Sequence, residues 1–185
     1  MKKLILLLFI PFVCLSQNDF RKMNWGESPK ILKERYTDIS FLKEIEGEMT
    51  ILSHKESVGG IQATVAYIFT QDKFFSGVYL FGYDSYSKDT TDRLKDFNNN
   101  ISARLNKKYK MTREDVWIND TWKNDPNSLD HALDMAHVSL IEKGSNNDTL
   151  ILHSLEETEG ELVHRLVYAF DKMMQQMQDS MDDDF

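Results

Sequence analysis

The sequence predicts an α+β fold built from two units, each a helix plus a three-stranded antiparallel meander, with the helices on one face of the sheet or sheets. Two observations lead to this prediction. Apolar residues alternate with a period of two over 49–83 and in runs over 137–170, as in half-buried strands. Between these stretches, Asp89–Tyr109 has apolar residues every three or four positions, as in an amphipathic helix.

The composition bounds the class of protein. The chain has 185 residues, of which 41% are hydrophobic and 28% charged, with eight Gly and three Pro. These values are ordinary for a globular domain and exclude a wholly disordered chain or a multi-spanning membrane protein.

The first half begins with a short helix and continues with three strands. Ser28 is placed to cap a helix whose first position is Pro29 and whose end is near Tyr36. The expected strands are Met49–Lys55, Ile61–Phe69 and Phe75–Tyr83. Turn-forming residues separate them, at Ser57–Gly60 and at Thr70–Lys73.

The second half repeats this order. Helix Asp89–Tyr109 carries one apolar stripe, composed of Leu94, Phe97, Ile101, Leu105 and Tyr109. A short strand is expected within Val116–Trp122, and Asp125-Pro126 predicts a helix start whose stripe is Leu129, Ala132, Leu133 and Ala136. The remaining expected elements are the strands His137–Ile141, Thr149–Leu155 and Leu162–Phe170, and a helix from Asp171 to about Ser180.

These elements define the expected domain organisation. Residues 17–178 form a single α+β domain, divisible into sub-units 17–87 and 88–178, and 179–185 form an acidic disordered tail. The strands can make one continuous antiparallel sheet or two small sheets, and the sequence leaves this choice open.

The first sixteen residues have the pattern of a secretory signal peptide. A basic start precedes ten apolar residues, Leu4–Val13, too few to cross a bilayer core of about 30 Å. Small residues then precede an expected cleavage between Ser16 and Gln17. In the alternative, Cys14 is lipidated, although a bulky Val13 is unusual before an acylated cysteine. We therefore expect a periplasmic or secreted protein.

Cleavage changes the charge and removes the only cysteine. The chain has 22 Lys and Arg against 30 Asp and Glu, and loss of Lys2 and Lys3 leaves 20, so the net charge goes from −8 to −10. Nucleic acid is not an expected partner, because phosphate binding needs clustered basic residues. Without cysteine, the mature chain has no disulfide, thiolate nucleophile or Cys-ligated metal. We also expect no transmembrane segment in it.

The segment Trp25-Gly26-Glu27-Ser28 carries a resemblance. With Leu32 downstream, it resembles the Trp-Gly-x-Ser opening of the first helix in small exported bacterial α+β proteins, the BamE-like and β-lactamase-inhibitor-like modules. The chain has Glu27 where the BamE-like pattern usually has Met. The resemblance covers about eight residues and implies an exported α+β module that binds other proteins without catalytic residues.

Three histidines form the candidate metal site. If Ile141 pairs with Thr149 and Leu155 with Leu162, then His137, His153 and His164 converge on one face of the C-terminal sheet. Three imidazoles with an open fourth position can hold zinc, and copper also accepts them. A register slip of one residue would destroy this alignment. The competing interpretation is that they are histidines at the edge of a core.

A second set of residues forms a candidate partner surface. Met173, Met177 and Met181 recur every four residues on the last helix, where thioethers can contact a partner helix or Cu(I), or simply pack on the sheet. Three tryptophans, Trp25, Trp117 and Trp122, can line a groove together with the sheet aromatics Tyr67, Tyr79, Phe81 and Tyr83, or belong to the core.

The sequence shows no Gly-x-Ser-x-Gly elbow, His-Glu-x-x-His helix or Gly-rich phosphate loop. Catalytic residues distant in sequence can still meet in the fold. We expect a non-catalytic binding or assembly module of the bacterial cell envelope, with no cofactor and with another envelope or secreted protein as its partner. The alternative is a Zn- or Cu-binding protein with the three-His site.

Overall fold

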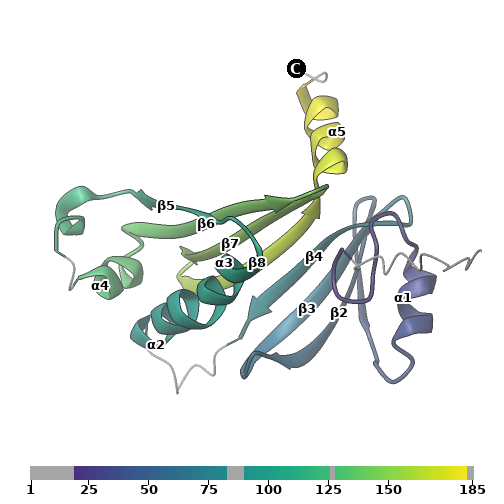
Figure 1. Cartoon of the computed structure of the whole chain (residues 1–185), viewed down its shortest axis with the longest axis horizontal. Coiled ribbons are helices and arrows are strands. Elements are labelled where there is room, and N and C mark those ends of the chain that lie inside the picture. The colour runs from purple at the N-terminus through teal and green to yellow at the C-terminus, as the bar shows by residue number, and fades with distance from the viewer. Residues whose placement is uncertain (1–18, 83–89, 126–127, 183–185) are drawn as a thin grey trace, which may run out of the picture.

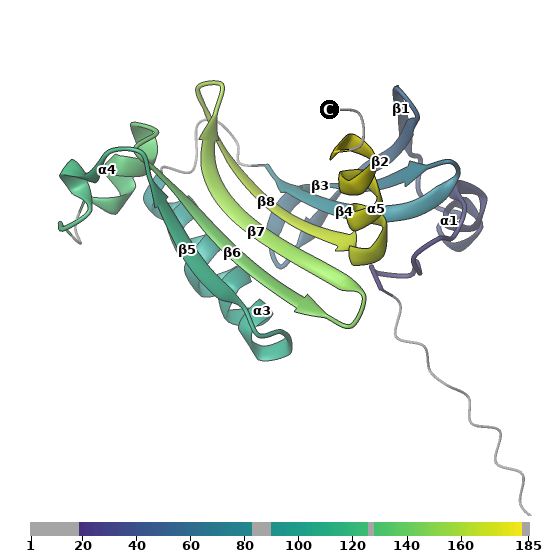
Figure 2. The same cartoon turned by 90° about the horizontal axis from the view of Figure 1, so that it is seen from above.

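The computed structural model describes residues 19–82, 90–125 and 128–182, with side chains described as far as Gln176 in the last stretch. It has eight antiparallel strands in one sheet, in the order β1-β2-β3-β4-β8-β7-β6-β5. The α+β class is therefore confirmed, and the alternative of two separate sheets is wrong. Figure 2 shows the sheet as one continuous surface. The predicted signal peptide, with Cys14 and the expected cleavage site, lies outside the described residues.

The N-terminal half contributes α1 and strands β1 to β4. Helix α1 spans Pro29–Arg35, as the Ser28-Pro29 signal predicts. The strands are β1 (Leu42–Glu46), β2 (Met49–Val58), β3 (Ile61–Thr70) and β4 (Lys73–Phe81). Strand β1 is absent from the predicted meander, so the observed meander has four strands and not three. All five residues of β1 are exposed, and an edge strand with no buried face shows no alternation to detect.

The C-terminal half contributes the other four strands and most of the helices. Helical elements are α2 (Thr90–Lys95), η1 (Asp96–Ser102), α3 (Ala103–Lys108), a 3₁₀ turn η2 (Asp120–Trp122), α4 (Leu129–Asp134) and α5 (Asp171–Asp182). The strands are β5 (Thr112–Trp117), β6 (Val138–Asn146), β7 (Thr149–Thr158) and β8 (Glu161–Phe170). Helix α4 starts at Leu129, not at the predicted Asp125-Pro126; Pro126 lies outside the described residues.

The predicted helix 89–109 is a run of three consecutive segments. Its middle part, η1, is a π-helix of seven residues between α2 and α3. A π-helix has a wider turn than an α-helix, so residues four apart stay closer to one face. Phe97, Ile101 and Leu105 are four apart and buried, as the stripe predicts. The wider turn also buries Ser102, a polar residue that the stripe does not contain.

One face of the sheet carries both helical layers. On β3, Val65, Tyr67 and Phe69 pack with Leu32 of α1 in one core cluster. On the same face of β3, Ile61 and Ala63 pack in a second cluster that contains Ile101 of η1 and Leu105 of α3. Alternate residues of a strand point to the same side, so α1 and α3 cover the same face (Figures 1 and 2).

Both C-terminal hairpins are longer than predicted, which changes the register. Strand β6 continues to Asn146, which pairs with Thr149, so Ile141 pairs with Ser154 and not with Thr149. Asn147 adopts φ +50° in a two-residue turn, a conformation that Asn tolerates better than most residues. In the next hairpin Leu155 pairs with His164, two positions beyond the predicted Leu162.

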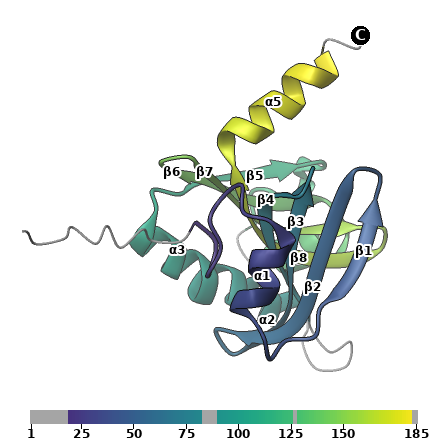
Figure 3. The ribbon, with the colours of Figure 1, turned by 90° about the vertical axis from the view of Figure 1, so that its right-hand side faces the viewer.

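Helix α5 does not close the fold over the sheet. It continues from the end of β8 and rises away from the sheet (Figures 1 and 3). It also extends to Asp182, so residues 179–182, expected in the disordered tail, are helical. Among the described residues, no helix combines the length and apolar character needed to cross a membrane.

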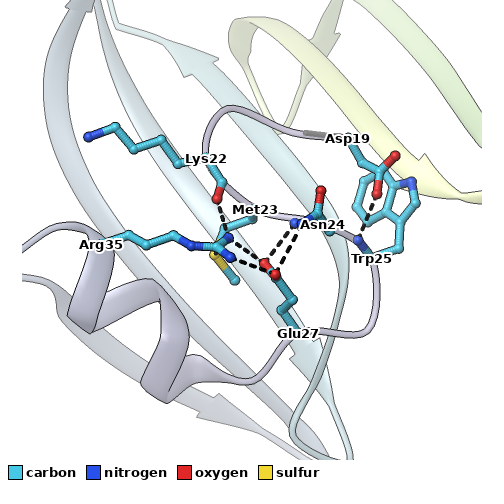
Figure 4. Close-up of polar contacts among 7 residues, drawn as sticks. All are labelled: Asp19, Lys22, Met23, Asn24, Trp25, Glu27 and Arg35. Carbon is cyan, nitrogen blue, oxygen red and sulfur yellow. Dashed lines mark hydrogen bonds and ion pairs between the residues drawn. The ribbon is translucent and has the colours of Figure 1, made fainter. Parts of the chain in front are cut away.

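Hydrogen bonds and an ion pair hold the Trp25-Gly26-Glu27-Ser28 segment in place before α1 (Figure 4). The Glu27 carboxylate accepts hydrogen bonds from the backbone N–H and side chain of Asn24, at 2.8 and 3.0 Å, and pairs with Arg35 of α1 at 2.5 and 2.7 Å. The Asp19 carboxylate accepts the backbone N–H of Trp25 at 2.8 Å. These contacts hold the backbone that leads into α1.

Candidate functional site

A pocket of about 230 Å³ lies between α3 and the centre of the sheet. Its walls come from β4 and β8, the two strands that join the halves of the sheet, and from η1 and α3 above them. The apolar lining residues are Val58, Phe81, Ile101, Leu105 and Leu166. The pocket is therefore at the junction of the two halves, on the helix-covered face.

Two cationic side chains line the pocket. Arg104 and Lys108 are one turn apart on α3 and both are exposed. The Arg104 guanidinium lies against Gly59 in the β2–β3 turn, where an added Cβ would be 3.0 Å from Nη1. Gly59 has φ +63°, which favours glycine, so the turn presents a flat surface to this guanidinium. No acidic residue is among the described lining residues.

Three tyrosines complete the lining. Tyr79 and Tyr168 lie on neighbouring strands with ring centroids 6.3 Å apart, and Tyr109 is 6.2 Å from Tyr168. Burial raises the pKa of Tyr79 to about 12 and also raises the pKa of Tyr168. The hydroxyls of both residues stay protonated at neutral pH and can donate hydrogen bonds.

Behind the pocket wall, four buried polar side chains form a chain of hydrogen bonds. Ser102 Oγ donates to Glu142 Oε2 at 2.6 Å, His153 Nδ1 is 2.9 Å from the same oxygen, and the Nε2 atoms of His153 and His164 are 2.8 Å apart. Exposure is 5% or less for all four. Phe81 pairs with His164 across β4 and β8, with ring centroids 4.5 Å apart, and separates this chain from the pocket.

The chain of hydrogen bonds fixes the protonation of its members. Burial opposes ionisation of Glu142, but the hydrogen bonds from His153 and Ser102 outweigh it and lower the pKa of the carboxyl. An ionised carboxylate only accepts, so His153 donates through Nδ1 and its Nε2 accepts from His164 Nε2–H. Burial lowers the pKa of His153, and the charge of Glu142 opposes this only in part. At neutral pH, both shifts therefore favour an ionised Glu142 and a neutral His153.

The structure brings together two of the three predicted metal ligands. His153 and His164 share a face because the β7–β8 register differs from the prediction by two, an even shift that preserves the side of the sheet. The predicted pairing of His137 with His153 is wrong, since Glu142 occupies that position. His137 precedes β6, and its Nδ1 is buried without a hydrogen-bond partner among the described residues.

The geometry of the two imidazoles is that of a hydrogen bond. Zinc bonds to each histidine nitrogen at about 2.0–2.1 Å and takes four ligands. Within residues 19–82, 90–125 and 128–182, no cluster of three or more His, Cys, Asp or Glu side chains could hold a metal ion. Ser102 donates its hydroxyl hydrogen to the Glu142 carboxylate and not to either imidazole.

The predicted partner-surface residues are dispersed. Trp25 stacks on Phe74 and Phe170, with ring centroids 5.0 and 6.1 Å away, and its Nε1–H donates to Thr149 Oγ1 at 3.1 Å. Trp117 and Trp122 pack against a core cluster under α4 at the other end of the molecule. The three rings therefore line no common groove.

The methionines of α5 are separate from the pocket. Met173 is half-buried and its neighbour Met174 is 41% exposed. Met177 and Met181 lie on the same helix, but their side chains fall outside the described ones. Helix α5 rises away from the sheet (Figures 1 and 3), and among the three predicted methionines only Met173 has a described side chain.

Of the sheet aromatics, Tyr79 and Phe81 line the pocket and Tyr67 is buried in the N-terminal core, while Tyr83 lies outside the described residues. Sequence reasoning missed the lining residues on α3. A signal was present: Arg104, Lys107, Lys108 and Lys110 are four basic residues within seven positions of an acidic chain.

No protein-family model, curated protein or solved structure matches this chain.

Proposed function

We propose that this protein is an exported, non-catalytic binding module of the cell envelope that binds a segment of another envelope or secreted protein in the pocket under α3. The observation that carries the proposal is the pocket itself, an apolar recess with protonated tyrosines and an open cationic margin. Recesses with apolar walls and a few polar groups are the usual places where a ligand is bound.

The position of the pocket supports this proposal. In our interpretation the halves of the sheet are two helix-and-meander units, and the partner binds where they meet, across the β4–β8 pair. Several lining residues, among them Val58, Tyr79, Tyr109 and Tyr168, are only partly buried, so an incoming side chain can cover them. The polar chain behind Phe81 fixes the floor, because Ser102 ties the helix to Glu142 of β6.

A blocked pocket tests the proposal. Peptides are selected from a random displayed library on the full chain, and their binding is then measured to two variants. Val58→Trp puts an indole at the pocket mouth, whereas Leu80→Trp adds the same ring to an exposed position on the other face of β4. We expect V58W to abolish binding and L80W to retain it. Equal binding to both variants, or no enriched peptide, contradicts the proposal.

The metal-binding alternative now depends on His153 and His164, whose Nε2 atoms are in contact. The other ring nitrogen of His153, Nδ1, is hydrogen-bonded to Glu142. A metal that binds only the native state stabilises it by about 2.7 kcal/mol at a hundred times its Kd. If the alternative holds, Zn²⁺ or Cu⁺ raises the melting temperature and His153→Ala abolishes the rise. If neither metal nor chelator changes the melting temperature, the metal-binding alternative is rejected and only the binding-module proposal remains.

A further inference from the structure

The basic residues of 104–110 stand out against the charge of the whole chain. Arg104, Lys107, Lys108 and Lys110 are all exposed, in a protein of net charge −8. Nine of the fifteen other described basic side chains have carboxylate partners, as Arg35 has Glu27 and Arg165 has Glu156. None of the four forms an ion pair with a described residue.

The four cations extend beyond the pocket. An open groove of about 400 Å³ adjoins it along the end of α3 and is lined by 106–111, including Lys107, Lys108 and Lys110. Lys108 and Tyr109 line both hollows, so the two hollows lie side by side. No described acidic side chain lines either one. The apolar pocket thus lies beside a groove whose charged lining residues are all basic.

This combination selects one class of occupant. An apolar side chain fits between Phe81, Leu105 and Leu166, and neighbouring carboxylates then lie beside the cations of α3. The tyrosine hydroxyls, protonated at neutral pH, can donate to a carboxylate as well. A free amphiphile with one carboxylate would use the pocket but leave the cations of the groove without a counter-charge.

Resting on the proposed function, we infer that the segment bound in the pocket is acidic, with one large apolar side chain entering under α3 and flanking Asp or Glu residues along 104–110. The charge complementarity of the pocket margin and the groove carries this inference. Binding is then selective for acidic segments and depends on ionic strength.

Four matched synthetic peptides test the charge and the anchor separately, by isothermal titration of the full chain. The reference is Gly-Asp-Asp-Phe-Asp-Asp-Gly; the others replace every Asp by Asn, every Asp by Lys, or the Phe by Ala. We expect only the reference to bind measurably at low salt, with an affinity that falls as salt is raised. Equal affinity for the Asp and Asn peptides overturns the inference.

Charge variants locate the contact. The double variant Arg104→Gln, Lys108→Gln should lower affinity for the reference peptide about tenfold, because it removes two charge contacts from a site where the ligand excludes water. Lys33 is an exposed basic residue of α1, and the control variant Lys33→Gln should leave the affinity for the reference peptide unchanged. A loss of the same size in K33Q overturns the assignment to the pocket, as does full affinity in the double variant.

Further arms separate this inference from the proposed function. If V58W abolishes binding of selected peptides while the charge variants do not, the pocket binds a neutral segment and only the inference fails. If no peptide binds in any arm, the proposed function fails with it. Sodium decanoate that binds at the pocket when the acidic peptide does not assigns the site to a free amphiphile and overturns the inference. Circular dichroism melts of each variant establish that it is folded.

Discussion

Replacing Glu142 by glutamine keeps the shape of the side chain and removes the charge at the centre of the buried polar chain. Glu142 accepts hydrogen bonds from Ser102 and His153 and is 5% exposed. A hydrogen bond to a charged group contributes about 1.5–3 kcal/mol, against about 0.5–1.5 kcal/mol between neutral groups. With two such bonds weakened, E142Q should lose about 2 kcal/mol of unfolding free energy at pH 7.

The assay is urea unfolding at a series of pH values, followed by tyrosine and tryptophan fluorescence. At pH 7 a loss of about 2 kcal/mol corresponds to a melting temperature lower by about 4–8 °C for a domain of this size. The control is Glu114→Gln on β5, whose carboxylate is 63% exposed and pairs with Lys143 at 3.2 Å. That surface pair should contribute less than about 1 kcal/mol.

The pH dependence has a definite sign. The pKa of Glu142 is lowered in the folded protein, so its contribution is complete above about pH 4.3, the value for an unfolded glutamate, and is lost as pH falls through the folded value. The gap between wild type and E142Q should therefore close in acid. A gap below about 0.5 kcal/mol at pH 7, or one that widens as pH falls, would refute the described charge state.

Three further perturbations test other parts of the structure. Gly77→Ala places a Cβ 2.4 Å from the ring of buried Phe20 and should lower the free energy of unfolding in urea by about 2 kcal/mol or more. The control Gly82→Ala has nothing nearer than 3.9 Å to its new Cβ and should lower it by less than about 0.5 kcal/mol. Equal losses in the two variants would contradict this packing. Since burial lowers the pKa of His153, its contribution to wild-type stability should be complete above about pH 6.5, and the free energy of unfolding should fall toward pH 5. His153→Gln should make this fall with pH smaller. An unchanged fall in the variant would assign the pH dependence to other groups. A double-mutant cycle of Trp25→Phe and Thr149→Val should give a coupling of about 1 kcal/mol from their hydrogen bond, and simple additivity would mean that the bond contributes nothing.

Periodicity predicted most of the elements that have a buried face. Strands β2, β3, β4, β7 and β8 and helix α1 follow from alternation or capping signals in the sequence. The edge strands are different. β1 is exposed throughout and β5 nearly so, so their residues show little alternation, and they become strands by pairing with β2 and β6.

Register was the point at which sequence reasoning failed for the site. The predicted strand ends at Ile141, but exposed ladder positions tolerate polar residues such as Ser145 and Asn146, and β6 continues to Asn146. The shorter predicted hairpin places His137 opposite His153, whereas in the structure Glu142 lies opposite His153 and contacts it. The pocket was not predictable from one segment, because its walls come from four separate parts of the chain.

The β4–β8 pair at the centre of the sheet has a consequence for how the chain folds. Ser76 donates to the carbonyl of Tyr168, 92 positions later, so the innermost ladder is among the last to become available during synthesis. Until then β4, whose residues Phe74–Gly77 are buried in the final structure, has one unpaired edge. Such an edge can recruit strands of other chains, and contacts this distant in sequence slow folding. Truncation before β8 should therefore yield an aggregating fragment.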